Sequence, residues 1–162
     1  MPKIEVLATI PNASPDAVFA DVARFERYPT IAKNVIAVAV TGTGDKLASS
    51  WEVTFRKGVL KWVEDDAVDH ATRRVAFTQT SGDLALFVGA WQVGAIDAKG
   101  AVPIEFVAEF DLGIPSLASM LDPVAARTLS ANARELIVAF AAAAGPALAT
   151  FVGRSEEPSV RR

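Results

Sequence analysis

The stretch from Trp51 to Asp66, WEVTFRKGVLKWVEDD, alternates apolar and polar residues on both sides of Lys57-Gly58. Alternation with a period of two predicts two strands, and the Lys-Gly pair between them predicts a two-residue hairpin turn. In that register Phe55 lies opposite Leu60. Each strand then has one apolar face and one wetted face, so the chain must build an antiparallel sheet with a buried side.

The apolar face of this hairpin ends in two acids. Continuing the alternation past Trp62 places Glu64 on that face and Asp66 after it. Burying a carboxylate is costly unless it is paired, protonated or next to a wet cavity. Two arrangements stay open, since the strand either continues past Asp65 or leaves the sheet there and puts the acids in solvent. We expect Glu64 to face inward, and for Asp66 both arrangements stay open.

Composition excludes several classes of function. The chain has 162 residues, no cysteine, one histidine and a net charge of -3, which suits one domain with a sizeable core. Thiolate sites are impossible, and His70 in a predicted turn is expected to be solvated, so we expect no metal and no cofactor. Scattered basic residues argue against a nucleic-acid partner.

The apolar segments are short. The longest apolar tract, Leu136 to Ala144, is far shorter than a membrane span, so we expect none. The first residues, MPKIEVLATIP, alternate like a strand and lack the apolar core and cleavage site of a signal peptide. The cytoplasm is therefore the expected location.

The rest of the chain predicts a meander that one helix covers. Lys3 to Ile10 alternates as a strand, and Ser14-Pro15 has the residues that begin a helix, which Tyr28-Pro29 then interrupts. Further strands joined by short turns follow, and a long amphipathic helix begins at Asp122-Pro123. Gly89 is expected to leave space on the inward face of its strand.

This order predicts an α+β fold in which a curved antiparallel sheet of about seven strands wraps around a long C-terminal helix, with two short helices after the first strand. One helix cannot fill the space on the concave side of a curved sheet, so we expect an internal cavity between the sheet and the helix. The domain is expected to cover residues 1–152, and the polar tail GRSEEPSVRR, residues 153–162, is expected to be disordered.

Four strings together resemble the helix-grip superfamily, which includes START domains, Bet v 1-like plant allergens and other SRPBCC proteins. They are FERYPTI, LKWVEDD, SGDLALFVGAWQV, and AEFDLGIP followed by SANARELIVAF. The likeness extends to about Phe151, and within the superfamily it is greatest to bacterial polyketide aromatase/cyclases of the tetracenomycin type. It implies a ligand cavity between the sheet and the long helix.

The resemblance also implies ligand-binding residues. By position Tyr28 matches an aromatic residue at the pocket mouth, and Asn132 matches a polar residue that the long helix points inward. The other residues that the resemblance or the strand and helix faces place in the cavity are Trp51, Phe55, Trp62, Phe87, Trp91, Phe106, Ala108 and Leu136. Where those cyclases have a serine and then an arginine after the pocket tryptophan, this chain has Glu64 and Asp66, so an arginine-based mechanism is not expected.

Two functions stay open. The first is an enzyme that folds a poly-β-ketone and promotes aldol ring closure with loss of water, with Glu64 as acid and base and Asp66 raising a pKa by like-charge repulsion. A carrier-bound substrate would make an acyl-carrier protein the partner. The second is a non-catalytic carrier of a quinone, lipid or other apolar or aromatic small molecule. A structural protein that uses the cavity as plain core is a third reading, against which Gly89 and the inward acids argue. The sequence leaves monomer and homodimer open.

Overall fold

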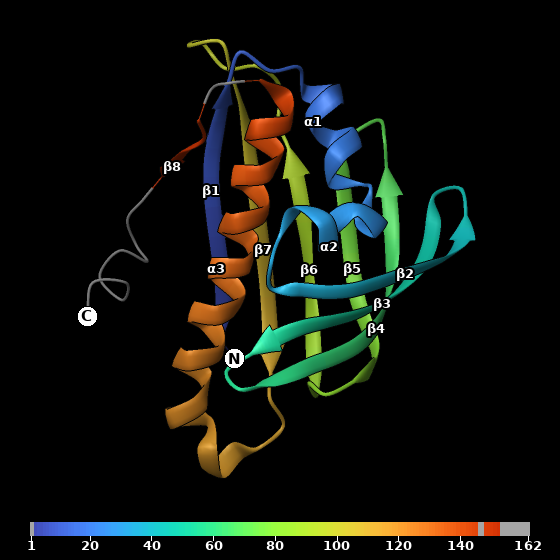
Figure 1. The fold of residues 1–162 in the computed structure, drawn as a ribbon, viewed down its shortest axis with the longest axis vertical. Coiled ribbons are helices and arrows are strands. Elements are labelled where there is room, and N and C mark those ends of the chain that lie inside the picture. Colours follow the sequence, from blue (N-terminus) through green and yellow to red (C-terminus); the bar gives the residue numbers. More distant parts are fainter. Residues whose placement is uncertain (1, 146–147, 153–162) are drawn as a thin grey trace.

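The computed structural model describes residues 2–145 and 148–152, which form one curved sheet with helices on its concave side (Figure 1). All strands pair antiparallel, in the spatial order β2-β3-β4-β5-β6-β7-β1-β8. The strands are β1 (Lys3–Pro11), β2 (Val35–Thr43), β3 (Lys46–Phe55), β4 (Gly58–Asp69), β5 (Arg74–Gly82), β6 (Leu86–Val93), β7 (Ala101–Asp111) and β8 (Thr150–Val152).

Helices connect β1 to β2 and follow β7. The helical segments are α1 (Pro15–Val22), a 3-10 turn at Phe25–Arg27, α2 (Tyr28–Ile31), a 3-10 turn at Pro115–Leu117, and α3 (Ala118–Ala144). The predicted start of the first helix is confirmed, because the Ser14 hydroxyl caps α1 and Pro15 occupies its first turn. Helix α3 packs on β1 and β7 and also meets α1 and α2.

Strand alternation produces the core. On β4, the inward residues Leu60, Trp62, Glu64, Asp66 and Val68 are buried and every residue between them is exposed. The apolar face of α3 closes over this side of the sheet with residues such as Leu136 and Phe140. The expected α+β helix-grip architecture is confirmed.

Three boundaries differ from the prediction. The sheet has an eighth strand, β8, which adds three residues to the edge of β1 and is too short to show alternation in the sequence. Helix α3 begins at Ala118, and Pro123 lies inside it, where proline leaves one backbone hydrogen bond of the helix unmade. Helix α2 begins at Tyr28, with Pro29 in its first turn. The predicted disordered tail, residues 153–162, lies outside the described residues.

The hairpin of β3 and β4 turns one residue earlier than predicted, which shifts the pairing partner of each residue by two. Phe55 pairs with Gly58, so the turn is Arg56-Lys57, with Arg56 at φ 57°. Leu60 therefore pairs with Val53 rather than with Phe55. A shift of two residues keeps every side chain on its predicted face, since the side-chain period of a strand is two.

The space expected at Gly89 is absent. A Cβ atom there would lie 2.2 Å from the Val107 carbonyl oxygen and 2.8 Å from the Phe77 ring. Gly89 therefore permits the close approach of β7 and of an aromatic ring, and it adds no volume to a cavity.

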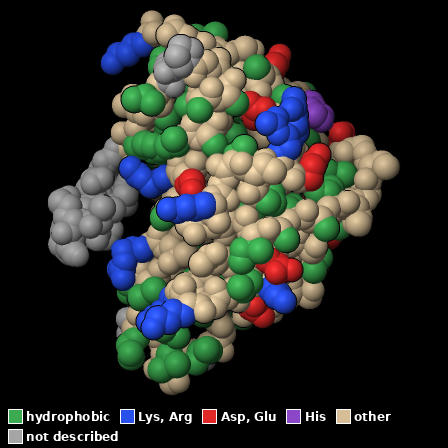
Figure 2. All heavy atoms as spheres, viewed as in Figure 1, with side chains coloured by type: hydrophobic (Ala, Val, Ile, Leu, Met, Phe, Trp, Pro, Cys, Tyr) green, Lys and Arg blue, Asp and Glu red, His purple; other side chains and the backbone are tan. Residues whose placement is uncertain are grey.

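The surface shows mixed chemistry. On the face drawn in Figure 2, Lys and Arg side chains lie singly or in small groups between hydrophobic and acidic ones. Within residues 2–145 and 148–152, no helix combines the length and the apolar character that crossing a membrane requires.

Candidate functional site

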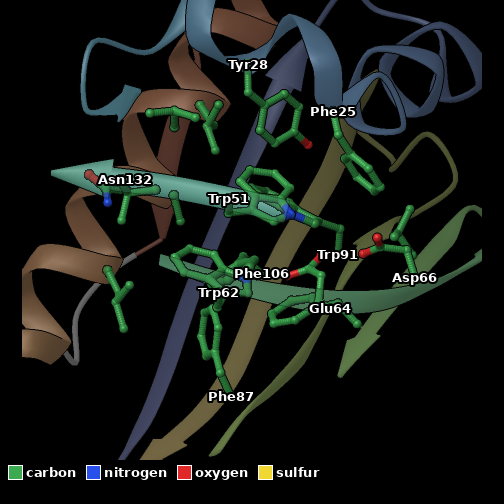
Figure 3. A pocket seen from close by; sticks show the side chains of 17 residues that line it. Phe25, Tyr28, Trp51, Trp62, Glu64, Asp66, Phe87, Trp91, Phe106 and Asn132 are labelled. Carbon is green, nitrogen blue, oxygen red and sulfur yellow. Dashed lines mark hydrogen bonds between the residues drawn. The ribbon is translucent and has the colours of Figure 1, made fainter. Parts of the chain in front are cut away.

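A cavity lies on the concave side of the sheet, between α3, the α1–α2 segment and strands β2 to β7 (Figure 3). A water-sized sphere can occupy about 70 Å³ of it, enough for several water molecules. Its walls are formed by Phe25, Tyr28, Val35, Trp51, Val53, Trp62, Glu64, Asp66, Val75, Phe77, Phe87, Trp91, Phe106, Leu129, Asn132, Ala133 and Leu136. Three of these side chains, Glu64, Asp66 and Asn132, are acidic or amide groups.

Most of the residues that the sequence places in the cavity lie in its wall. Ten do so, namely Tyr28, Trp51, Trp62, Glu64, Asp66, Phe87, Trp91, Phe106, Asn132 and Leu136. Two do not. Phe55 is half-buried at the hairpin end of β3, and Ala108 is buried opposite Gly89, where the strands approach too closely to leave room.

Tyr28 also differs in detail from the expectation. It is 1% exposed rather than at an open mouth, and its hydroxyl donates a hydrogen bond of 2.6 Å to the Val22 carbonyl. Burial is the main cause that raises the pKa of Tyr28 well above its ordinary value. The hydroxyl thus ties α2 to α1 above the cavity.

Two tryptophans form the centre of the wall. Trp51 on β3 and Trp62 on β4 are cross-strand partners, and their rings stack with centroids 5.8 Å apart and planes inclined by 2°. The Phe87 ring meets Trp62 edge to face at 5.3 Å. Such stacked and edge contacts are the preferred arrangements of aromatic rings. They give the cavity a flat aromatic surface.

Each indole N–H of this pair is tied to an acid. Trp62 Nε1 donates directly to Glu64 Oε1 at 2.7 Å. Trp51 Nε1 donates to Ser49 Oγ at 2.8 Å, and Ser49 Oγ donates to Asp66 Oδ2 at 2.5 Å. An indole nitrogen can only donate, so the Ser49 oxygen accepts from Trp51 and the Ser49 hydroxyl hydrogen remains available for Asp66 Oδ2.

The two acids are buried side by side on β4, at 4% exposure for Glu64 and 2% for Asp66. Burial, followed by interaction with the Asp66 carboxyl, raises the pKa of Glu64 from 4.5 to about 10. Burial also raises the pKa of Asp66, while the hydrogen bonds from Glu64 and Ser49 oppose that rise. Burial therefore favours the protonated form of both carboxyl groups, and Glu64, whose pKa lies near 10, keeps its proton at neutral pH.

Two oxygen atoms of the wall lack a hydrogen bond. Asp66 Oδ1 and Asn132 Oδ1 are both buried without a partner in the structure. Figure 3 shows Asp66 and Asn132 at opposite ends of the cavity, with the tryptophans between them. Unpaired buried polar atoms are rare because each costs free energy, so both ends of this cavity have unused capacity to bind polar groups.

Sequence reasoning missed several wall residues and one hydrogen-bonding residue. Extending the alternation of β3 backward from Trp51 by two positions would have placed Ser49 on the inward face, where it is 2% exposed. The same alternation on β5 gives Val75 and Phe77. Phe25 shows no such signal, since it lies in a 3-10 turn whose orientation depends on packing.

No group of histidine, cysteine, aspartate and glutamate side chains suitable for a metal was found among the described residues. His70 is exposed, and its ring meets Phe19 edge to face at 5.5 Å. Two carboxyl groups inside an aromatic cavity can accept and donate protons.

Solved structures with the same fold include proteins of diverse origin. A Thermus thermophilus protein, TTHA0849, superposes with a TM-score of 0.78 at 20% identity, covering 87% of this chain and 95% of its own. The Zhui aromatase/cyclase from a Streptomyces species superposes at 0.75 and 18% identity, covering 88% and 93%. A START superfamily protein from Mycobacterium smegmatis superposes at 0.69 and 14% identity, covering 83% and 93%.

At these identities the structural likeness shows the fold, and the sequence adds the family. No curated protein matches the sequence. Residues 11–137, most of the chain, match the family described as polyketide cyclase / dehydrase and lipid transport. The protein therefore belongs to the polyketide cyclase / dehydrase and lipid transport family, and it has the helix-grip fold.

Proposed function

We propose that the protein is a cyclase/dehydratase that closes an aldol ring on a poly-β-ketone or related intermediate and removes water from it, with Glu64 and Asp66 as the catalytic pair. The observation that supports this most is the buried carboxyl pair, in which one member is protonated and the other has a free oxygen in the cavity. Two neighbouring acids with separated pKa values are the usual source of an acid and a base in one site.

The dehydration step needs both members. Asp66 Oδ1 removes the proton from the carbon between the ring carbonyl and the hydroxyl-bearing carbon, and the electron pair forms an enolate. The enolate reforms the carbonyl and expels the hydroxyl group. The Glu64 proton joins that leaving oxygen, so the products are an unsaturated ring ketone and one molecule of water.

The pair then resets itself. After the step Asp66 has gained a proton and Glu64 has lost one. The two side chains lie on the same face of β4 two residues apart, so the proton returns from Asp66 to Glu64 without solvent. No cofactor is needed, because the net reaction consumes no electrons and no protons.

The walls would supply orientation. The stacked Trp51 and Trp62 rings offer a flat surface on which an unsaturated ring can lie. A substrate that displaces water from the cavity would strengthen the interactions of the acids with developing charge. The volume of about 70 Å³ is far below the roughly 300–1,000 Å³ of pockets that hold drug-sized ligands. A poly-β-ketone, free or delivered by an acyl-carrier protein, therefore requires lining side chains or α3 to move.

A non-catalytic carrier is the second candidate. The wall is largely aromatic and aliphatic, which suits an apolar metabolite such as a quinone or lipid without any reaction. The family description also includes lipid transport. Under this alternative the acids have no chemical role, and changing them would leave ligand transfer intact.

A small surrogate substrate separates the two functions. We expect the protein to convert 5-hydroxycyclohex-2-enone into phenol and water, followed by the absorbance of phenol. Glu64→Gln and Asp66→Asn should each lower the rate by about two to four powers of ten. Asp65→Asn is the matched control, since Asp65 lies between them on β4 and is exposed. Binding of phenol without turnover by the wild type would reject the enzyme and favour the carrier.

A further inference from the structure

Two buried oxygen atoms at the ends of the cavity, of which Asp66 Oδ1 is also the base of the proposed reaction, determine which ligand groups the cavity can bind. Asp66 Oδ1 and Asn132 Oδ1 have no hydrogen-bond partner. Both residues line the cavity and are nearly fully buried, at 2% and 8% exposure. A ligand that satisfies them would recover the free energy that their burial costs.

The two groups belong to distant parts of the fold. Asp66 is on β4, whereas Asn132 is on α3, which packs on β1 and β7. In the sheet order, β5 and β6 separate β4 from β7. Figure 3 accordingly shows the two side chains at opposite ends of the cavity, with the rings of Trp51 and Trp62 between them.

The chemistry of each end differs. At the first end, Ser49 donates to Asp66 Oδ2 and Trp62 donates to Glu64 Oε1. Asp66 Oδ1 is the oxygen that remains available to accept a hydrogen bond from a ligand. At the second end, no hydrogen bond of the Asn132 side chain is present in the structure. Its amide can accept and donate, which matches a hydroxyl group.

We propose that the cavity selects a flat aromatic or enolised ring system with a hydroxyl group at each end, that is, a diphenol or its enol precursor, rather than a quinone or an aromatic ether. One hydroxyl donates to Asp66 Oδ1 and the other meets the Asn132 amide, while the ring lies on the tryptophan pair. The inference rests on the proposed use of this cavity for ligands and deepens it, since a phenolic ring is the product that dehydration and aromatisation create.

Asn132 is then retained for ligand binding at the expense of stability. An unpaired buried amide destabilises the empty protein, so Asn132→Leu, of similar volume, should raise the urea midpoint of unfolding. A structural asparagine would behave in the opposite way, because removing its hydrogen bonds would lower that midpoint.

The test compares diols with matched ligands that lack one donor, by tryptophan fluorescence titration. The pairs are hydroquinone with 4-methoxyphenol, and 2,6-dihydroxynaphthalene with 6-methoxy-2-naphthol, which bracket two lengths. For the pair of fitting length, the wild type should bind the diol at least about fivefold more tightly, as one hydrogen bond is worth. In Asn132→Leu this ratio should fall to about one. Gln79→Leu, which changes an amide outside the cavity wall, should keep the wild-type ratio.

Equal affinity of the wild type for diol and ether in both pairs would overturn the proposal, as would an unchanged ratio in Asn132→Leu or a failure of every aromatic probe to bind. None of these readouts requires turnover. Diol selectivity without dehydration would reject the proposed dehydratase activity and support diol binding. Dehydration without diol selectivity would support the dehydratase activity and reject diol binding.

Discussion

Replacing Glu64 by glutamine should change how stability depends on pH. The folded protein raises the pKa of Glu64 from 4.5 to about 10, so the folded state keeps a proton that the unfolded chain releases above pH 4.5. The contribution of Glu64 to stability is then fully present below pH 4.5 and is lost as the pH rises toward 10. Glutamine resembles the protonated acid and cannot titrate, so the variant lacks this loss.

The magnitude follows from one proton. A proton bound only in the folded state changes the free energy of unfolding by about 1.4 kcal/mol per pH unit. Between pH 6 and pH 8 the wild type should therefore lose about 3 kcal/mol relative to Glu64→Gln. Against a typical domain stability of about 5–15 kcal/mol, that difference is large. The hydrogen bond from Trp62 Nε1 can be kept by the glutamine oxygen, so the comparison isolates the proton.

Urea unfolding curves at several pH values measure the effect. Asp65→Asn is the control, because Asp65 is exposed on the opposite face of β4, and its curve should run parallel to that of the wild type. If the free energies of Glu64→Gln and the wild type stay parallel from pH 6 to pH 8, then Glu64 is ionised in the folded protein and the reasoning from burial is refuted.

Three further perturbations test individual features. Ser49→Ala removes the partner of Trp51 Nε1 and Asp66 Oδ2, so urea unfolding should show a loss of about 1–3 kcal/mol per unpaired group. The pKa of Asp66 should also rise, which moves the acid limb of the pH-rate profile to higher pH. An unmoved limb would show that the Ser49 hydrogen bond does not influence the catalytic carboxyl group. Gly89→Ala places a Cβ atom 2.2 Å from the Val107 oxygen and should lower the free energy of unfolding by at least about 1–3 kcal/mol. Gly58→Ala, whose added Cβ has its nearest atom at 3.8 Å, should lower it far less. Equal losses of stability would contradict the close packing at Gly89. Leu136→Ala should lower the free energy of unfolding by about 2–5 kcal/mol, yet it should strengthen the binding of 2-naphthol, measured by fluorescence, because it enlarges the cavity. Val138→Ala, on the exposed side of α3, should leave that binding unchanged. Weaker binding by Leu136→Ala would mean that the ligand does not bind in the cavity.

Alternation predicted the fold and the inward face of β4. A strand has a strict period of two, so Trp62, Glu64 and Asp66 had to share one side even though the predicted hairpin register was wrong by two residues. The extent of β4 settles the position of Asp66, which the sequence left open, because the strand continues to Asp69.

The predictions that were wrong concern positions where contacts between strands decide the outcome. Gly89 suggested space in the sequence, yet the Phe77 ring and the β7 backbone fill that position. Ala108 was expected in the cavity for its small size, and it is buried instead by the same close approach. Residue type specifies how much volume a side chain leaves, whereas the distance between neighbouring elements decides what fills it.

The hydrogen-bond chain was also beyond sequence reasoning. The route from Trp51 through Ser49 to Asp66 joins two strands diagonally, since Ser49 pairs with Glu64 and bonds to Asp66. A pattern along one strand contains no information about such diagonal contacts. The same chain supplies a hydrogen bond from Ser49 that opposes the rise in the pKa of Asp66.

The protonation state of Glu64 tests the proposed chemistry most directly. Carbon-13 NMR of labelled glutamate side chains, with the Glu64 signal assigned by its loss in Glu64→Gln, follows this carboxyl group as the pH is raised from 5 to 9. We predict that Glu64 stays protonated through neutral pH and titrates far above 4.5. Titration of Glu64 near 4.5 would contradict the assignment of this pair as a preformed acid and base.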